Sequence, residues 1–208
     1  MPLLYGFAVI PLLELFIKPS PNNLSVAEKE LTKADRLYDW LVWFIVPVQV
    51  GFVIWYFFNI QTVEAFSISW WGRTISLGMM CGVLGINVAH ELGHRKSWFE
   101  KVLAKILLMT SLYPHFFIEH NYGHHKNVAT AADPASARYN ELLYTFWFRS
   151  IIGSYLHAWK IEAERLSRKN TSPYSLGNEM IQFTLIEVVL IGTTYILFGG
   201  AVLLGFLL

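Results

Sequence analysis

Long apolar runs separated by polar segments constrain this chain more than any other feature. Residues 37–58, 74–90 and 180–198 are each apolar over about the 20 residues that a helix needs to cross hydrocarbon, and residues 3–17 form a shorter run. Only 15% of the residues are charged, against about a quarter in soluble domains. The sequence therefore predicts an all-α, integral-membrane helix bundle whose surroundings are a lipid bilayer.

The two ends of the sequence also lie in apolar runs. The run at 3–17 begins almost at Met1, and the last run continues to Leu208. Gly199-Gly200 divides that last run and indicates a tight turn between two helices. We therefore expect residues 1–208 to form a single membrane-embedded domain that is incomplete, truncated at both ends.

The positions of lysine and arginine predict the topology. Four of the sixteen lie in 18–37 and eleven in 91–178, which places both segments on the cytoplasmic side by the positive-inside rule. The apolar stretch 102–118 and the amphipathic stretch 141–169 are then expected to be helices on that side, at the surface or folded back against the bundle. The net charge of +1 gives no reason to expect a nucleic-acid partner.

Five of the seven histidines fall into two clusters. His90 and His94 are four residues apart at the end of an expected spanning helix, so both imidazoles lie on one helical face. In the second cluster His120 and His124 share a face if the segment is α-helical, and His125 points about 100° further round. Both clusters fall on the predicted cytoplasmic side, where their imidazoles can converge on one or two metal ions.

Two other interpretations of the histidines were weighed. His90-Glu91-Leu92-Gly93-His94 fits the HExxH pattern of zinc metalloproteases, in which the glutamate is catalytic. Zinc proteolysis does not call for a second cluster of three histidines, whereas many imidazoles at one site suit a pair of iron ions. The second alternative, polar residues scattered at a helix end, does not account for two spaced sets on the same side of a membrane.

The strings around the histidines resemble a known family. NVAHELGHRKSWFEK and YPHFFIEHNYGHHKNVAT, followed by DPASAR, are similar to the first two histidine boxes of the membrane-bound alkane 1-monooxygenases. The resemblance implies six membrane helices in a bacterial inner membrane and a non-haem centre of two iron ions at the cytoplasmic face. It also implies hydroxylation of the terminal methyl group of an alkane or fatty chain with O2, with electrons from rubredoxin and its reductase. The iron ligands implied by the motif match are His90, His94, His120, His124 and His125.

The sequence departs from the family's pattern after the second box. The family carries a further histidine and a third histidine box, and no histidine follows His157 here. Ala131-Ala132 also replaces a proline and an acidic residue, without touching an expected ligand. The chain by itself is therefore expected to be inactive. The alternatives that stay open are a fatty-acid desaturase or hydroxylase of the histidine-box class, a membrane zinc metalloprotease and an inactive fragment.

Several residues near the boxes are candidates for a supporting role. Glu91 and Glu119 each adjoin an expected ligand, Asp133 begins a turn before Pro134, and His115 lies about 140° from the ligand face. His157 is expected to be a surface histidine on the amphipathic stretch. Three glycines on one side of the helix before the first box predict either close helix packing or a channel for a linear chain: Gly78, Gly82 and Gly85.

Overall fold

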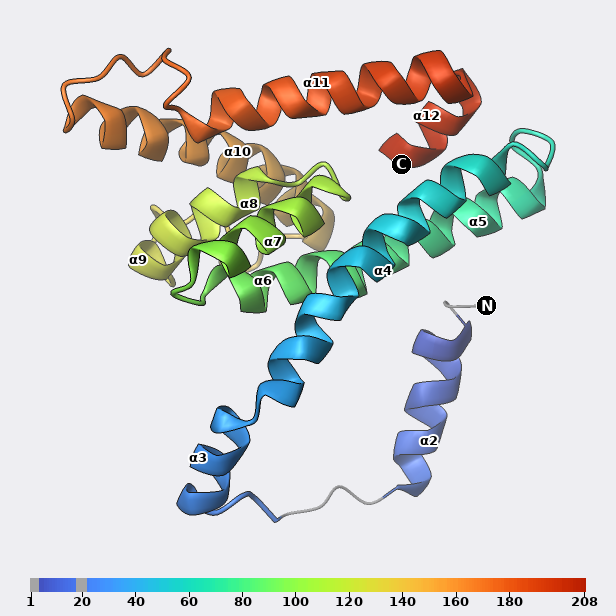
Figure 1. Cartoon of the computed structure of the whole chain (residues 1–208), viewed down its shortest axis with the longest axis horizontal. Helices are drawn as coiled ribbons and strands as arrows, with labels where there is room; N and C mark the ends of the chain where they lie inside the picture. Colours follow the sequence, from blue (N-terminus) through green and yellow to red (C-terminus); the bar gives the residue numbers. More distant parts are fainter. Residues whose placement is uncertain (1–3, 18–21) are drawn as a thin grey trace.

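The computed structural model describes residues 4–17 and 22–208, and these ranges contain helices and connecting turns without any strand (Figure 1). In chain order the helices are the π-helix η1 (Tyr5–Val9), α2 (Ile10–Phe16), α3 (Val26–Ala34), α4 (Arg36–Ile60), α5 (Ile68–Met80), the π-helix η2 (Cys81–Ile86), α6 (Asn87–Gly93), α7 (Trp98–Met109), α8 (His115–Ile118), the π-helix η3 (Glu119–His124), α9 (His125–Asn127), α10 (Leu143–Ser167), α11 (Glu179–Phe198) and α12 (Gly200–Leu207). The predicted all-α class is confirmed.

Three of the described helical segments are long and apolar enough to cross a membrane: Arg36–Ile60, Ile68–His94 and Glu179–Phe198. They correspond to the expected spans 37–58, 74–90 and 180–198, and the chain is an integral membrane protein. The 25 residues of α4 extend about 38 Å at 1.5 Å per residue, more than the roughly 30 Å of bilayer hydrocarbon.

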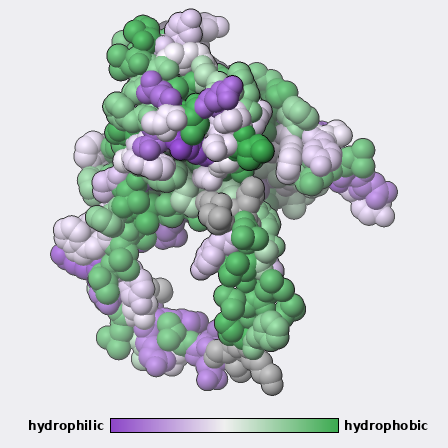
Figure 2. Space-filling view, turned by 90° about the vertical axis from the view of Figure 1, so that its right-hand side faces the viewer, coloured by the Kyte–Doolittle hydropathy of each residue, from purple (hydrophilic) through white to green (hydrophobic). Residues whose placement is uncertain are grey.

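The first apolar run forms a shorter helix. Of the expected segment 3–17, residue 3 lies outside the described residues, and Tyr5–Phe16 is helical but below spanning length. Figure 2 shows this helix between two grey segments, with a surface that is almost wholly hydrophobic. An apolar helix so exposed requires lipid or another apolar surface around it.

The three spanning helices alternate in direction. Arg95, just after α6, forms an ion pair with Asp39 at the start of α4, and Lys105 on α7 binds Glu179 at the start of α11 at 2.6 Å. At the opposite end, the ring of Phe57 near the end of α4 packs 5.3 Å from that of Phe198, which ends α11. The ion pairs of Arg95 and Lys105 thus lie at one end of the bundle, and the contact of Phe57 with Phe198 lies at the other.

Side-chain caps determine where the spanning helices begin. Asp35 accepts a hydrogen bond from the backbone N–H of Leu37, Ser67 from that of Trp70, and Asn178 from that of Met180. Gly199 has φ +84°, a conformation that favours glycine, and it ends α11 at the predicted turn. These residues position the helix ends through contacts within a few positions along the chain.

Two segments differ from the sequence prediction, and a third confirms it. The stretch 102–118 is divided between α7 and α8 because the chain turns at Leu112, whose φ is +50°, and α8 starts after Pro114. The polar segment 18–37 contains the helix α3, which the capping box of Ser25 and Glu28 starts, and residues 18–21 lie outside the described residues. The stretch 141–169 forms α10 as expected.

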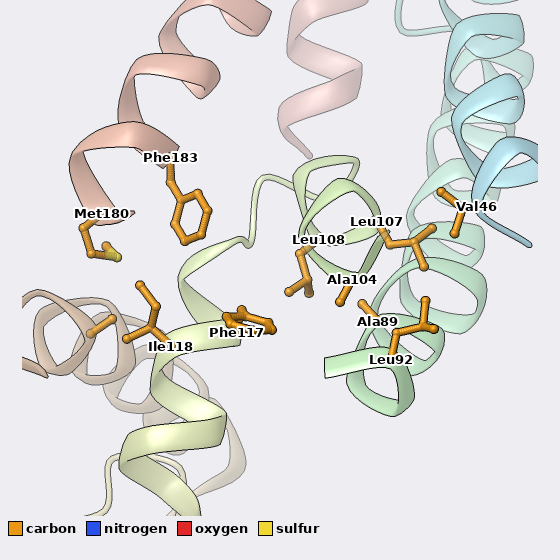
Figure 3. Packing of buried hydrophobic residues seen from close by; sticks show 11 residues of the cluster. Val46, Ala89, Leu92, Ala104, Leu107, Leu108, Phe117, Ile118, Met180 and Phe183 are labelled. Carbon is orange, nitrogen blue, oxygen red and sulfur yellow. The ribbon is translucent and has the colours of Figure 1, made fainter. Parts of the chain in front are cut away.

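A hydrophobic cluster fixes α6 and α7 against each other. Figure 3 shows Ala104 and Leu107 of α7 facing Ala89 and Leu92 of α6, and none of the four is more than 1% exposed. Fully burying one leucine side chain is favourable by about 1.5–3 kcal/mol. Because His90 and His94 lie on this same helix α6, the cluster also fixes the position of the first histidine box.

Close packing at Gly205 holds the last helix in place. α12 folds back so that a Cβ atom at Gly205 would overlap Tyr56 Oη and lie 3.0 Å from both Thr74 Oγ1 and Trp70 Cζ2. Tyr56 and Thr74 are themselves joined by a hydrogen bond of 3.0 Å between their hydroxyls. No side chain larger than hydrogen fits at this position without displacing that pair.

We predict that Gly205→Ala destabilises the protein by about 1–3 kcal/mol, because the added methyl group overpacks the contact with Tyr56. Thermal unfolding in detergent micelles measures this effect. Gly192→Ala on α11 is the matched control, because a Cβ there meets nothing within 4 Å and alanine favours helix over glycine. Equal melting temperatures for the two variants would contradict the packing described here.

Candidate metal centre

The first histidine box lies at the end of the second spanning segment. His90 is on α6, and His94 follows its last residue by one position, so the two imidazoles are one helical turn apart. Their Nε2 atoms lie 3.1 Å from each other. The expectation that these two side chains share a face is thus met by the geometry.

The second box is wound as a π-helix rather than the α-helix that its spacing predicts. In η3 the backbone pairs i with i+5 rather than i+4, so a residue five positions along comes round to the same side. The Nε2 atoms of His120 and His125 are accordingly 3.0 Å apart, and the Nε2 of His120 lies 3.2 Å from that of His94. The expectation that His125 turns away from His120 is therefore wrong, whereas His120 and His124 do lie together, with their rings stacked at 5.4 Å between centroids.

Hydrogen bonds among the imidazoles cannot account for these contacts. The Nε2 atoms of His90, His94, His120 and His125 form a chain of three contacts of 3.0–3.2 Å. Each ring nitrogen carries either one hydrogen or one in-plane lone pair, so it takes part in only one hydrogen bond and at most two contacts are satisfied. The ligand nitrogens of His90, His94 and His120 all lie within 4.8 Å of one another, which fits a shared metal ion, because nitrogens about 2.1 Å from one ion at right angles lie about 3.0 Å apart.

The surroundings keep His120 neutral. Burial, together with repulsion from the imidazoles of His90, His125, His94 and His124, lowers the pKa of His120 to about 3. The ring of Phe116 stacks on it with 4.7 Å between centroids. A neutral imidazole presents the lone pair that metal coordination requires.

His124 is oriented by a carboxylate. Its Nδ1 lies 2.8 Å from Asp133 Oδ2, so Nδ1–H donates to the carboxylate and Nε2 is left with its lone pair. Asp133 is itself fixed by the backbone N–H of Ala135 at 2.9 Å and by the hydroxyl of Ser136 at 2.5 Å. Burial raises the pKa of Asp133, but these hydrogen bonds outweigh it and leave the pKa below its usual value. The turn predicted at Asp133-Pro134 therefore holds an imidazole in place.

Glu119 and His157 form a second carboxylate–imidazole pair beneath the second box. Glu119 is 2% exposed, and its Oε1 lies 3.2 Å from Nδ1 of His157 on α10. Burial raises the pKa of Glu119, opposed by the contact with His157. A Cβ at Gly123 would lie 2.8 Å from Glu119 Oε1 and 2.9 Å from His157 Nδ1, so only glycine leaves room for the pair.

The interpretation of His157 as a surface histidine is therefore wrong, because the side chain is half-buried against Glu119. The pairing joins residues 38 positions apart, which local periodicity does not reveal. The sequence offers one signal of this burial. His157 precedes Ala158, which lies on the buried side of α10 together with Ser154 and Leu166.

The remaining two candidates lie outside the group of imidazoles. Glu91 is exposed and contacts Arg95 at 3.5 Å. His115 is buried between the rings of Tyr113 and Tyr155, and burial lowers its pKa to about 4. Within the described part of the chain, neither residue has a hydrogen bond to any of the five box histidines.

Comparison with known proteins places the chain in a family. The sequence model of a family described as fatty acid desaturase matches residues 68–208, more than half of the chain. The chain belongs to the fatty acid desaturase family. The matched residues include both histidine boxes and two of the three spanning segments, Ile68–His94 and Glu179–Phe198.

Curated relatives of this desaturase-family chain are alkane monooxygenases. Alkane 1-monooxygenase 1 of Alcanivorax borkumensis is 36% identical over 97% of this chain and 50% of its own length. The alkane 1-monooxygenases of Ectopseudomonas oleovorans and Pseudomonas putida are 37% and 39% identical over 97% and 95% of the chain and 50% and 49% of their own lengths. The resemblance predicted from the two boxes is confirmed, and the chain spans about half the length of these relatives.

We predict that Asp133→Asn in this desaturase-family chain weakens metal binding roughly 10–100-fold, because the neutral amide no longer strengthens and orients His124. Titration of the purified protein with Fe²⁺ under anaerobic conditions gives the affinity.

Glu64→Gln is the control, since Glu64 is an exposed carboxylate in the loop between α4 and α5 and leaves the affinity unchanged. An Asp133→Asn protein that binds Fe²⁺ as tightly as the original would show that His124 does not depend on this carboxylate.

Proposed function

We propose that this chain provides the first two histidine boxes of an oxygenase that hydroxylates the terminal carbon of alkanes or similar apolar chains. The proposal rests on one observation. The Nε2 atoms of His90, His94, His120 and His125 form three close contacts, and hydrogen bonds can satisfy only two of them. The alkane 1-monooxygenases with which the chain aligns support this reaction class.

The proposed cofactor is a pair of non-haem iron ions held by His90, His94, His120, His124 and His125. Imidazole is a good ligand for iron, and five of them exceed what a zinc site takes, because catalytic zinc keeps three protein ligands. When bound, the iron pair supplies the O2-derived oxidant that a primary C–H bond requires and that side chains do not provide.

The chain's own residues orient and shield that centre. His120 stays neutral through burial, and Asp133 fixes the tautomer of His124 through its Nδ1–H. Phe116 covers one face of His120 with an apolar ring. The protein's contribution is thus a preset arrangement of the imidazoles, in which His120 is neutral and His124 is oriented by a carboxylate.

An apolar cavity leads along the helix toward the first box. It has a volume of about 200 Å³ and is lined by Leu77, Gly78, Cys81, Gly82 and Ile86, together with residues of α12 and three hydroxyl-bearing residues, Thr74, Thr110 and Ser111. Ile86 is one helical turn before His90. A linear chain that enters from the bilayer and occupies this cavity would point its end at the imidazoles.

The glycines separate into two roles. A Cβ at Gly78 or Gly82 meets nothing within 4 Å, whereas one at Gly85 lies 3.3 Å from Ser111 Oγ and 3.4 Å from Thr110 Oγ1. The close packing expected for all three glycines therefore holds only for Gly85. Gly78 and Gly82 leave space in the cavity instead, as the channel hypothesis requires.

We predict that Gly82→Trp, made in a complete homologue, shifts the preferred substrate to shorter alkanes, because the indole fills the cavity below the first box. Turnover of a series of linear alkanes measures the preference. Gly51→Trp on α4 is the control: a Cβ there also meets open space, and Gly51 is outside the cavity lining. An unchanged preference in Gly82→Trp would refute the channel.

We also propose the orientation and the electron donor. The end of the bundle with the histidines faces the cytoplasm of a bacterial inner membrane, and reduced rubredoxin, supplied by its reductase, docks there. Five basic residues of the segment 91–178 form ion pairs with carboxylates: Arg95, Lys105, Arg149, Arg165 and Arg168. The other six leave a positive surface that favours an acidic carrier.

Iron content and product analysis test the proposed function. Purified protein loaded anaerobically with Fe²⁺ is expected to bind iron, and His120→Ala to lose most of it, because His120 contacts two of the other imidazoles. In a complete homologue supplied with rubredoxin, its reductase and isotope-labelled O2, a linear alkane should yield the labelled primary alcohol. Asn127→Ala is the control variant for iron binding, since Asn127 ends α9 beside the second box but is no expected ligand.

Other outcomes identify the alternatives. One equivalent of zinc and no iron would indicate a metalloprotease built on the HELGH sequence. A desaturated or internally hydroxylated fatty chain would indicate a desaturase or hydroxylase of the histidine-box class, consistent with the family's description. Iron binding without any product would show that the chain lacks part of the catalytic machinery.

A further inference from the structure

One side chain of α10 lies against both ends of the turn that carries the second histidine box. The turn η3 begins at Glu119, and Gly123 lies four positions further on. Glu119 Oε1 is 3.2 Å from Nδ1 of His157, and a Cβ atom at Gly123 would lie 2.9 Å from that same nitrogen. The imidazole of His157 therefore fixes where Glu119 and the backbone of Gly123 lie relative to each other.

The helix that carries His157 is held by contacts of its own. α10 is 25 residues long, and Ser154 and Ala158, on either side of His157, are at most 4% exposed. Further along, Glu162 Oε2 accepts a hydrogen bond of 2.7 Å from the backbone N–H of Glu179, at the start of α11. α10 is thus a long support with several anchors, and the short turn η3 packs directly on it.

A side chain inside the turn also disfavours α-helical winding. Asn121 Nδ2 donates a hydrogen bond of 2.8 Å to the backbone carbonyl of Phe117. In an α-helix this carbonyl accepts from the backbone N–H four positions on, which is that of Asn121 itself. The amide side chain therefore competes with α-helical pairing where α8 passes into η3.

The winding of the turn decides which imidazole reaches the others. The Nε2 atoms of His120 and His125 are 3.0 Å apart. In an α-helix a residue five positions along points about 140° away, so His125 would face a different side of the turn from His120. A π-helical turn is rare and is found mostly where function requires it, so surrounding contacts have to hold it in place.

We propose that the Glu119–His157 pair locks the second box in its π-helical winding and thereby brings His125 to the metal centre. His157 is a positioning residue, because it acts through the turn and has no hydrogen bond to an expected ligand within the described residues. Gly123 belongs to the lock, since only glycine leaves room for the pair. This inference rests on the proposed metal centre but not on the proposed oxygenase reaction.

A double-mutant cycle with Co²⁺ as the probe tests the lock. The purified chain is titrated with Co²⁺ alone under anaerobic conditions, and the visible absorption of the imidazole-bound ion gives the affinity. His157→Ala should weaken binding roughly 10–100-fold, as is usual for residues that orient metal ligands from behind. In a His125→Ala background the same change should alter the affinity by no more than about twofold, because the ligand that the lock delivers is already absent.

Two further variants separate positioning from a general loss of structure. His157→Gln keeps an N–H group that donates to Glu119, so it should recover most of the affinity that His157→Ala loses. Leu156→Ala is the control, because Leu156 precedes His157 on α10 but is 61% exposed, and it should leave the affinity unchanged. A His157→Gln protein as weak as His157→Ala would count against a lock made by this hydrogen bond.

Gly123→Ala tests the same turn without any change on α10. The added methyl group would lie 2.8 Å from Glu119 Oε1 and 2.9 Å from His157 Nδ1, so it forces the pair apart, whereas alanine favours helix over glycine. Gly123→Ala should weaken Co²⁺ binding as His157→Ala does, and only while His125 is present. The cycle is read from this variant if His157→Ala does not fold.

The outcomes distinguish the lock from the function. Equal weakening with and without His125 would overturn the lock, because the pair would then support the protein in general. A chain that binds no Co²⁺ would overturn the lock together with the proposed metal centre. A cycle that behaves as expected, beside a complete homologue that forms no alcohol, would support the lock and reject only the oxygenase reaction.

Discussion

Every backbone N–H and C=O of a segment in hydrocarbon must find its partner within the protein, and the rest of this structure depends on that constraint. It turns the apolar runs into straight helices of fixed length and leaves the polar chemistry to their ends. His90 and His94 occupy such an end, where packing of α6 on α7 through Leu92 and Leu107 holds them. The ion pair of Lys105 with Glu179 draws the start of α11 to the same end of the bundle.

The candidate centre then depends on how the second box is wound. A π-helical turn at Glu119–His124 brings His125 to within 3.0 Å of His120, Nε2 to Nε2, where an α-helix would have turned it away. Such a turn forgoes regular i to i+4 pairing, and π-bulges recur at functional sites. Two buried carboxylates stabilise the arrangement: Asp133 orients His124, and Glu119 pairs with His157.

α10 connects the centre with the surface of the molecule. His157 and Glu162 of α10 contact Glu119 and Arg165, and the N-terminal half of the helix carries exposed apolar side chains. One amphipathic helix thus supports the second box and presents an apolar surface outward.

The sequence by itself determined the class of structure and most of the chemistry. The apolar runs predicted the spans, the spacing of His90 and His94 predicted their shared face, and the strings around both boxes predicted the relatives that comparison confirmed. These features are local, because helix formation, capping and hydropathy depend on residues within a few turns.

Only the tertiary structure decided which side chains meet across long separations. The π-helical winding of the second box, the pairing of Glu119 with His157 and the position of α12 against Tyr56 at Gly205 all depend on packing between distant segments. A periodic pattern predicts that a residue is buried. It does not predict which distant segment packs against that residue, because many segments could cover the same apolar face.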